Sequence, residues 1–109
     1  MNIEELRSYC LSKKGVTEDL PFGPDTLVFK VMDKMFLLTG MGRPLQFNVK
    51  CQPDRALEWR EQYPDEVLPG YHMNKKHWNT IIVDGRLSGR QVKEMIDDSY
   101  GLVAPKKKK

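Results

Sequence analysis

The residues best suited to chemistry in this sequence are Lys75, Lys76, His77 and Asn79, within the stretch Gly70–Thr80, GYHMNKKHWNT. Lysine ammonium groups meet phosphate oxygens as mobile point charges. An asparagine amide reaches a base edge or a sugar-phosphate, and an imidazole adds a further hydrogen bond. The group therefore predicts electrostatic contact with a nucleic-acid backbone, most directly that of DNA.

This basic stretch differs from the rest of the chain in its charge. No acidic residue occurs between Glu66 and Asp84, although the chain has 18 Lys and Arg residues against 15 Asp and Glu. The last four residues are all lysine, which leaves 14 basic side chains against 15 acidic ones in the remainder. A near-neutral body gives no general attraction to nucleic acid, so the prediction depends on this local patch. Cations from the preceding strands and loops would extend it if they face the same way: Lys30, Lys34, Arg43 and Lys50.

Two other interpretations of the same stretch stay open. In one, Tyr71, His72, Asn74 and Trp78 line a cleft for a small anion, a peptide or a partner protein. In the other, the stretch is structural: Asn74 and His72 hydrogen-bond loop backbone, as Asn does in turns. Trp78 shares a strand face with Thr80, which favours a core position over a stacking platform. A concave pocket would favour the cleft, and a convex basic surface would favour nucleic acid.

Metal binding and catalysis are not predicted. His72 and His77 are five residues apart and have no cysteine or third ligand nearby in the sequence. The sequence contains no Gly-rich phosphate loop, no GxSxG elbow and no HExxH motif. Cys10 and Cys51 lack a neighbouring motif that would activate a thiolate. We therefore predict a binding module without a metal, a cofactor or catalytic residues.

The two cysteines and the amino terminus indicate the compartment. Cys10 and Cys51 form no CxxC pair, and the chain begins with the acidic stretch Met1–Glu5, unlike a secretory signal. We expect free thiols in the core and a cytoplasmic protein. No apolar run approaches the roughly 20 residues of a membrane helix, so no membrane partner is predicted. A monomer is favoured.

The pattern of apolar residues predicts three helices and four strands. Asn2 with Glu5, and Ser88 with Gln91, have the spacing of capping boxes that begin helices. The expected helices are 3–13, 53–63 and 89–103, and the expected strands are Leu27–Val31, Met35–Thr39, Leu45–Lys50 and Trp78–Val83, with a turn at Asp33-Lys34. The order α-β-β-β-α-β-α predicts an α+β fold with a mainly antiparallel sheet and helices packed on one face. We assign residues 1–105 to one domain and 106–109 to a lysine tail.

These patterns also assign positions to apolar side chains in two segments. In the second helix, Ala56 and Leu57 are expected to face inward, together with Trp59 or the aliphatic stem of Arg60. In the connection PFGPDT, Pro21 and Pro24 hold a tight approach to the first predicted strand, with Phe22 as a hydrophobic plug.

Four strings in the sequence resemble the MmcQ/YjbR family. They are PFGPDTLVFKV at Pro21–Val31, EQYP at Glu61–Pro64, PGYHMNKKHWNT at Pro69–Thr80 and DDSYGLV at Asp97–Val103. The resemblance covers nearly the whole chain. It implies a fold similar to that of frataxin (CyaY-like) and a proposed likeness to a "double wing" DNA-binding domain. It implies no enzymatic activity.

Overall fold

The computed structural model describes residues 1–42, 44–70 and 73–104. Three residues of the predicted sites, Arg43, Tyr71 and His72, lie outside the described residues, as does the tail 106–109. The elements follow the chain as α1 (Ile3–Leu11), β1 (Val16–Asp19), β2 (Thr26–Val31), β3 (Lys34–Gly40), β4 (Leu45–Lys50), α2 (Pro53–Gln62), β5 (Val67–Pro69), β6 (Trp78–Val83) and α3 (Gly89–Val103).

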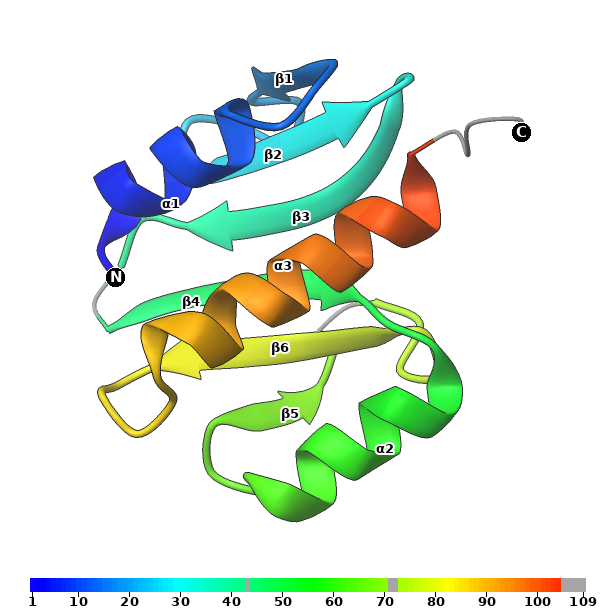
Figure 1. The fold of residues 1–109 in the computed structure, drawn as a ribbon. Coiled ribbons are helices and arrows are strands. Elements are labelled where there is room, and N and C mark those ends of the chain that lie inside the picture. The colour runs from blue at the N-terminus through cyan, green and yellow to red at the C-terminus, as the bar shows by residue number, and fades with distance from the viewer. Residues whose placement is uncertain (43, 71–72, 105–109) are drawn as a thin grey trace.

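The strands form one six-stranded sheet in the order β1-β2-β3-β4-β6-β5, and every neighbouring pair is antiparallel. In Figure 1, α3 crosses in front of the middle of the sheet, with α1 beside one half and α2 beside the other. Side chains from all three helices join one hydrophobic core with Phe29, Phe47 and Ile81 of the sheet. The predicted α+β class and helices on one face are therefore confirmed.

The alternation along β4 shows how the sequence separates the two faces of the sheet. Leu45, Phe47 and Val49 are buried in the core. Gln46, Asn48 and Lys50 alternate with them, so their side chains point to the face opposite the helices. Lys50, one of the cations of the predicted basic patch, is partly exposed on this face.

Two short edge strands were not predicted. β1 (VTED) has only alternate partly buried residues, and β5 has three residues ending in Pro69. Such short segments give too few apolar positions to show a period of two, and proline favours an edge. The predicted element order is otherwise present, with these strands added at both edges of the sheet.

Three details of the expectation are wrong. The β2–β3 turn is made by Met32 and Asp33, whose φ angles are 53° and 64°, one residue earlier than expected. Leu57 is 53% exposed, because the inward face of α2 is narrow and takes only Ala56 and Trp59. Phe22 is 67% exposed and fills no core position.

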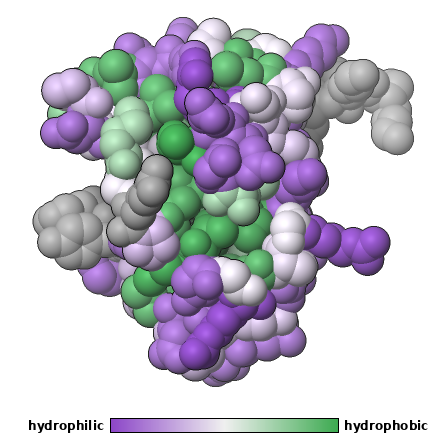
Figure 2. Space-filling model, turned by 90° about the vertical axis from the view of Figure 1, so that its left-hand side faces the viewer, coloured by the Kyte–Doolittle hydropathy of each residue, from purple (hydrophilic) through white to green (hydrophobic). Residues whose placement is uncertain are grey.

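Apolar side chains also reach the surface at one end of the molecule. Figure 2 shows that end, where a band of apolar side chains runs between polar flanks. The β1–β2 and β3–β4 connections lie at this end (Figure 1), and they carry the exposed Leu20, Phe22 and Met41. None of the described helices is long and apolar enough to cross a membrane.

Both cysteines are buried free thiols, as expected. Burial is the main cause that raises the pKa of the Cys10 thiol to about 12, and burial also raises the pKa of Cys51. A raised thiol pKa keeps the thiolate population low near neutral pH. These cysteines therefore act as small core residues.

Candidate nucleic-acid interface

The two lysines of the basic stretch lie on a tight turn that leads into β6. The side-chain Oδ1 of Asn74 accepts a hydrogen bond of 2.9 Å from the backbone N–H of Lys76. The backbone N–H of His77 donates to the carbonyl of Asn74 over 3.1 Å. Asn74, Lys75 and Lys76 are exposed, whereas His77 is half-buried. The turn thus holds its own backbone and presents both ammonium groups to solvent.

Arg60 of α2 ties this turn to the body of the protein. Its Nε donates to Oδ1 of Asn79 over 2.7 Å, and its Nη2 donates to the carbonyl of Lys75. A longer contact of 3.4 Å joins Nη2 to the carbonyl of Trp78. One guanidinium therefore satisfies acceptors on both sides of the point where the turn becomes a strand, and it fixes the position of Lys75 relative to α2.

The structure places Asn79 in the interior, in contrast to its predicted place on the binding surface. Its side chain is 1% exposed. Its Oδ1 accepts from Arg60, and its Nδ2 donates to the carbonyl of Ala56 over 3.4 Å. In β6, Asn79 and Ile81 share the face that the helices cover, because side chains alternate along a strand. Asn79 is thus a positioning residue for the turn and does not belong to the exposed surface.

Trp78 occupies the opposite face of β6 and is also buried, at 9% exposure. Gly70 packs directly against it: a Cβ on Gly70 would lie 2.7 Å from the Trp78 Cβ and 3.0 Å from its carbonyl oxygen. The backbone N–H of Gly70 donates to that same carbonyl over 2.9 Å. The expectation that Trp78 is a core residue rather than a stacking platform agrees with this burial.

A third lysine lies beside the turn. Lys50, the last residue of β4, is directly opposite Trp78 in the register, so both side chains point to the face away from the helices. The next residue, Cys51, donates its backbone N–H to the carbonyl of His77 over 2.7 Å. We call Lys50, Lys75, Lys76 and His77 the lysine surface.

The lysines of this surface have no carboxylate partner within the described parts of the chain, 1–42, 44–70 and 73–104. The other two predicted lysines are placed differently. Lys30 shares the open face but lies two strands away, with its Nζ 3.7 Å from Oδ2 of Asp19. Lys34 lies at the same end of the sheet as Lys50, but it is opposite the core residue Val31 and so projects to the other face. The structure therefore joins Lys50 to the turn and leaves Lys30 and Lys34 apart from it.

Comparison with known proteins identifies the family. The family model named YjbR matches residues 11–102. The chain belongs to the YjbR family. Its YjbR-family relative in Escherichia coli K12, the uncharacterized protein YjbR, is 34% identical over 102 residues, which cover 92% of this chain and 85% of that one. The uncharacterized protein YbdF of Escherichia coli O157:H7 is 40% identical over 84 residues, 76% of this chain and 68% of that protein.

Solved structures agree with the YjbR assignment. The crystal structure of a Deinococcus radiodurans protein with the family domain DUF419 has a TM-score of 0.89 and 39% identity, over 94% of this chain and 78% of that chain. A crystal structure from Pseudomonas syringae has a TM-score of 0.78 and 28% identity, over 94% and 99% of the two chains. The YjbR fold described above is thus shared along almost the whole chain.

The structure describes only two of the four residues that were expected to line a cleft, Asn74 and Trp78. Asn74 is exposed and Trp78 is buried, while Tyr71 and His72 lie outside the described residues. Neither Asn74 nor Trp78 lines any of five surface cavities that the structure shows, which lie around the three helices and the β2–β3 turn. A cleft around these residues stays a prediction. In the described ranges, no group of three or more His, Cys, Asp or Glu side chains is arranged to hold a metal ion.

Sequence reasoning missed one buried carboxyl group close to β6. Glu66 is 3% exposed, and its Oε2 has no hydrogen-bond partner among the described residues. The nearest cation is Arg86, whose Nε lies 3.6 Å away on a largely exposed side chain. Loss of hydration is the main cause that raises the pKa of Glu66, and the neighbouring carboxylate of Asp84 raises it further.

We expect Glu66→Gln to make this YjbR-family protein more stable at about pH 7 and to have little effect near pH 4. A carboxyl group with a raised pKa in the folded state ionises more readily in the unfolded chain, so stability falls as pH rises above the ordinary value. The glutamine side chain does not ionise, so the variant does not lose this stability as the pH rises. Urea unfolding at several pH values measures the effect, with the exposed Glu61→Gln as control. A variant that is less stable than the parent at neutral pH would contradict the expectation.

Proposed function

We propose that this protein binds DNA as a non-enzymatic module, through contacts between the lysine surface and the phosphate backbone. The observation that carries the proposal is the gathering of Lys50, Lys75 and Lys76 at one end of the sheet, without carboxylate partners among the described residues. Arg60 and Asn74 hold the turn in place, so little backbone ordering is needed when a phosphate binds.

The contact would be electrostatic and independent of base sequence. Lysine ammonium groups on phosphates position a protein on the duplex but read no sequence. His77 adds a hydrogen-bonding group at the edge of the same surface. Because Asn79 is buried, no amide from the strand is left to reach a base edge at this site. We therefore propose weak binding without sequence preference, in a cytoplasmic protein whose buried thiols suit a reducing compartment.

The experiment is a fluorescence-anisotropy titration of labelled duplex DNA with protein ending at Pro105, repeated over a series of salt concentrations. Removing the lysine tail ensures that the folded domain alone supplies the charge. The logarithm of the binding constant should fall linearly with the logarithm of salt concentration, with a slope of about −0.9 for each phosphate neutralised. Three lysines give a slope of about −3 at most. No binding at low salt would refute the proposal.

A further inference from the structure

A separate cavity of about 560 Å³ lies at the Val31 end of β2, on the side of the sheet that the helices cover, and shares no lining residue with the lysine surface. The turn after α1, the β2–β3 turn and the last turn of α3 enclose it. Its volume is in the range of roughly 300–1,000 Å³ that is typical of small-molecule sites. The lining residues are Lys13, Lys14, Gly15, Val31, Met32, Tyr100 and Ala104.

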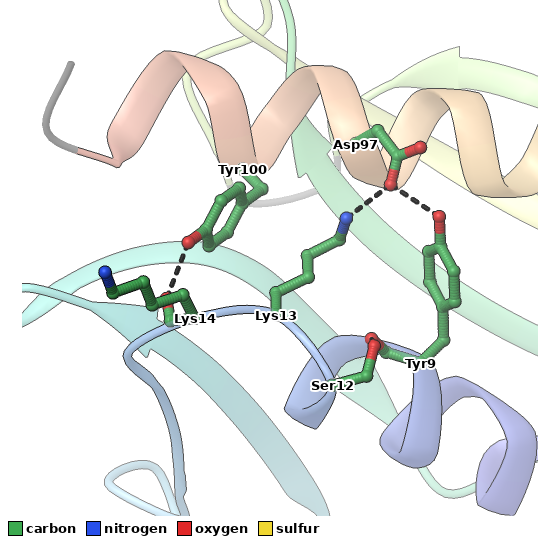
Figure 3. Close-up of polar contacts among 6 residues, drawn as sticks. All are labelled: Tyr9, Ser12, Lys13, Lys14, Asp97 and Tyr100. Carbon is green, nitrogen blue, oxygen red and sulfur yellow. Dashed lines mark hydrogen bonds and ion pairs between the residues drawn. The ribbon is translucent and has the colours of Figure 1, made fainter. Parts of the chain in front are cut away.

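The apolar part of this cavity is held in a fixed shape. Val31 belongs to the core, and the Tyr100 ring packs edge-on against Phe36 with centroids 5.5 Å apart. The Tyr100 hydroxyl donates to the backbone carbonyl of Lys14 over 2.5 Å (Figure 3). Met32 closes one side, although it is 68% exposed and has a left-handed φ of 53°. A methionine is unusual in that conformation, since glycine and asparagine adopt it at lower cost.

The charged residues that line the cavity are both lysines, and one of them is paired with a carboxylate. Lys13 is already paired: its Nζ lies 2.5 Å from Oδ1 of Asp97, which also accepts from the Tyr9 hydroxyl over 2.6 Å. Figure 3 shows the Lys14 ammonium pointing away from this network. Lys14 has no carboxylate partner in the part of the chain that the structure describes. Two cations therefore border the cavity, of which one is free.

Lys34 adds a second free cation on the same side. It lies directly opposite Val31 in the β2–β3 register, and opposite residues project to the same face of a sheet. Because Val31 lines the cavity, Lys34 projects toward the side of the sheet on which the cavity opens. It is exposed and, among the residues described, pairs with no carboxylate.

We propose that this cavity binds a small amphipathic monocarboxylate, such as a medium-chain fatty acid. The hydrocarbon part contacts Val31, Met32 and the Tyr100 ring, where removal of apolar surface from water stabilises the complex. The carboxylate lies at the mouth between Lys14 and Lys34, where it forms charge-assisted hydrogen bonds. This site uses none of the residues of the lysine surface, so it stands or fails independently of DNA binding.

The test is an NMR titration of the ¹⁵N-labelled full chain with octanoate, with octanol as an uncharged probe of the same length. Amide shifts should move at Gly15 and Met32 in a saturable way. Lys14→Gln/Lys34→Gln should weaken octanoate binding about tenfold, with little effect on octanol. The matched control, Arg90→Gln/Lys93→Gln, removes two exposed cations that do not line the cavity and should leave the affinity for octanoate unchanged.

Several results would overturn the proposal. One is the absence of saturable shifts up to about 10 mM octanoate. Another is equal binding of octanoate by the Lys14→Gln/Lys34→Gln variant and the parent, or shifts that cluster away from the cavity. Binding to vesicles of anionic phospholipid without binding of free octanoate would show that this end meets a membrane surface instead.

Discussion

Replacing Gly70 with alanine is expected to lower the free energy of unfolding by about 3 kcal/mol. The added Cβ would lie 2.7 Å from the Trp78 Cβ, 3.0 Å from the Trp78 carbonyl oxygen and 3.1 Å from the Met73 Cβ. Two of these atoms belong to the buried Trp78 of β6, one of them a backbone oxygen, and the third is the Met73 Cβ. None of the three is the end of a flexible side chain that could move aside. The change must shift β6 or break the hydrogen bond from Gly70 N–H to Trp78.

Chemical denaturation of the purified variant measures this loss, and Gly101→Ala is the matched control. Gly101 lies within α3, and a Cβ there would meet nothing within 4 Å. Alanine at an exposed helical position stabilises by about 0.5–1 kcal/mol relative to glycine. The two alanine substitutions should therefore change stability in opposite directions. A loss below about 1 kcal/mol for Gly70→Ala would show that the close approach to Trp78 is readily relaxed.

The second large effect is expected at Arg60. Arg60→Met keeps most of the aliphatic stem but removes the donor to Asn79 Oδ1 and to the carbonyl of Lys75. Asn79 is 1% exposed, so water does not replace the lost donor without a rearrangement. An unsatisfied buried acceptor costs about 1–3 kcal/mol, and more than one acceptor is affected here. We expect a loss of about 2–4 kcal/mol in the free energy of unfolding.

Arg60→Met also tests whether the order of the turn affects DNA binding, when binding is measured under conditions in which the variant is folded. Below its unfolding temperature, Arg60→Met should still contain β6 but have a less ordered turn, and so bind DNA more weakly although every lysine is retained. Arg90→Met is the control, because Arg90 is exposed on α3 and should change stability by less than about 0.5 kcal/mol. Unchanged stability of Arg60→Met would contradict the role given to the guanidinium.

Local patterns in the sequence predicted the elements that depend on local chemistry. Both capping boxes are present: Asn2 accepts from the Glu5 N–H over 2.8 Å, and Ser88 accepts from the Gln91 N–H over 3.1 Å. The bounds of β4 and β6 match the expectation, since each has enough residues to show alternation. The edge strands β1 and β5 were missed because pairing with a neighbour defines them more than their own side chains do.

The candidate site could be predicted only in part, because contacts between residues far apart in the sequence decide where some of its side chains lie. Lys75 and Lys76 are exposed, as their place in a polar turn indicates. The burial of Asn79 depends on α2 covering one face of β6 and on the guanidinium of Arg60, which is 19 positions away in the sequence. The place of Lys50 beside the turn depends on the β4–β6 register. Contacts of this range leave no periodic signal in a single sequence.

The most direct test of the lysine surface compares two charge-matched variants in the salt titration, both ending at Pro105. Lys75→Gln/Lys76→Gln removes two charges from the turn, and Arg90→Gln/Lys93→Gln removes two exposed charges from α3. If the turn contacts phosphates, the first variant should lose about 2 units of the salt slope and most of its affinity at low salt, while the second keeps the slope of the parent. Equal slopes and equal affinities for the two variants would contradict DNA binding by the lysine surface.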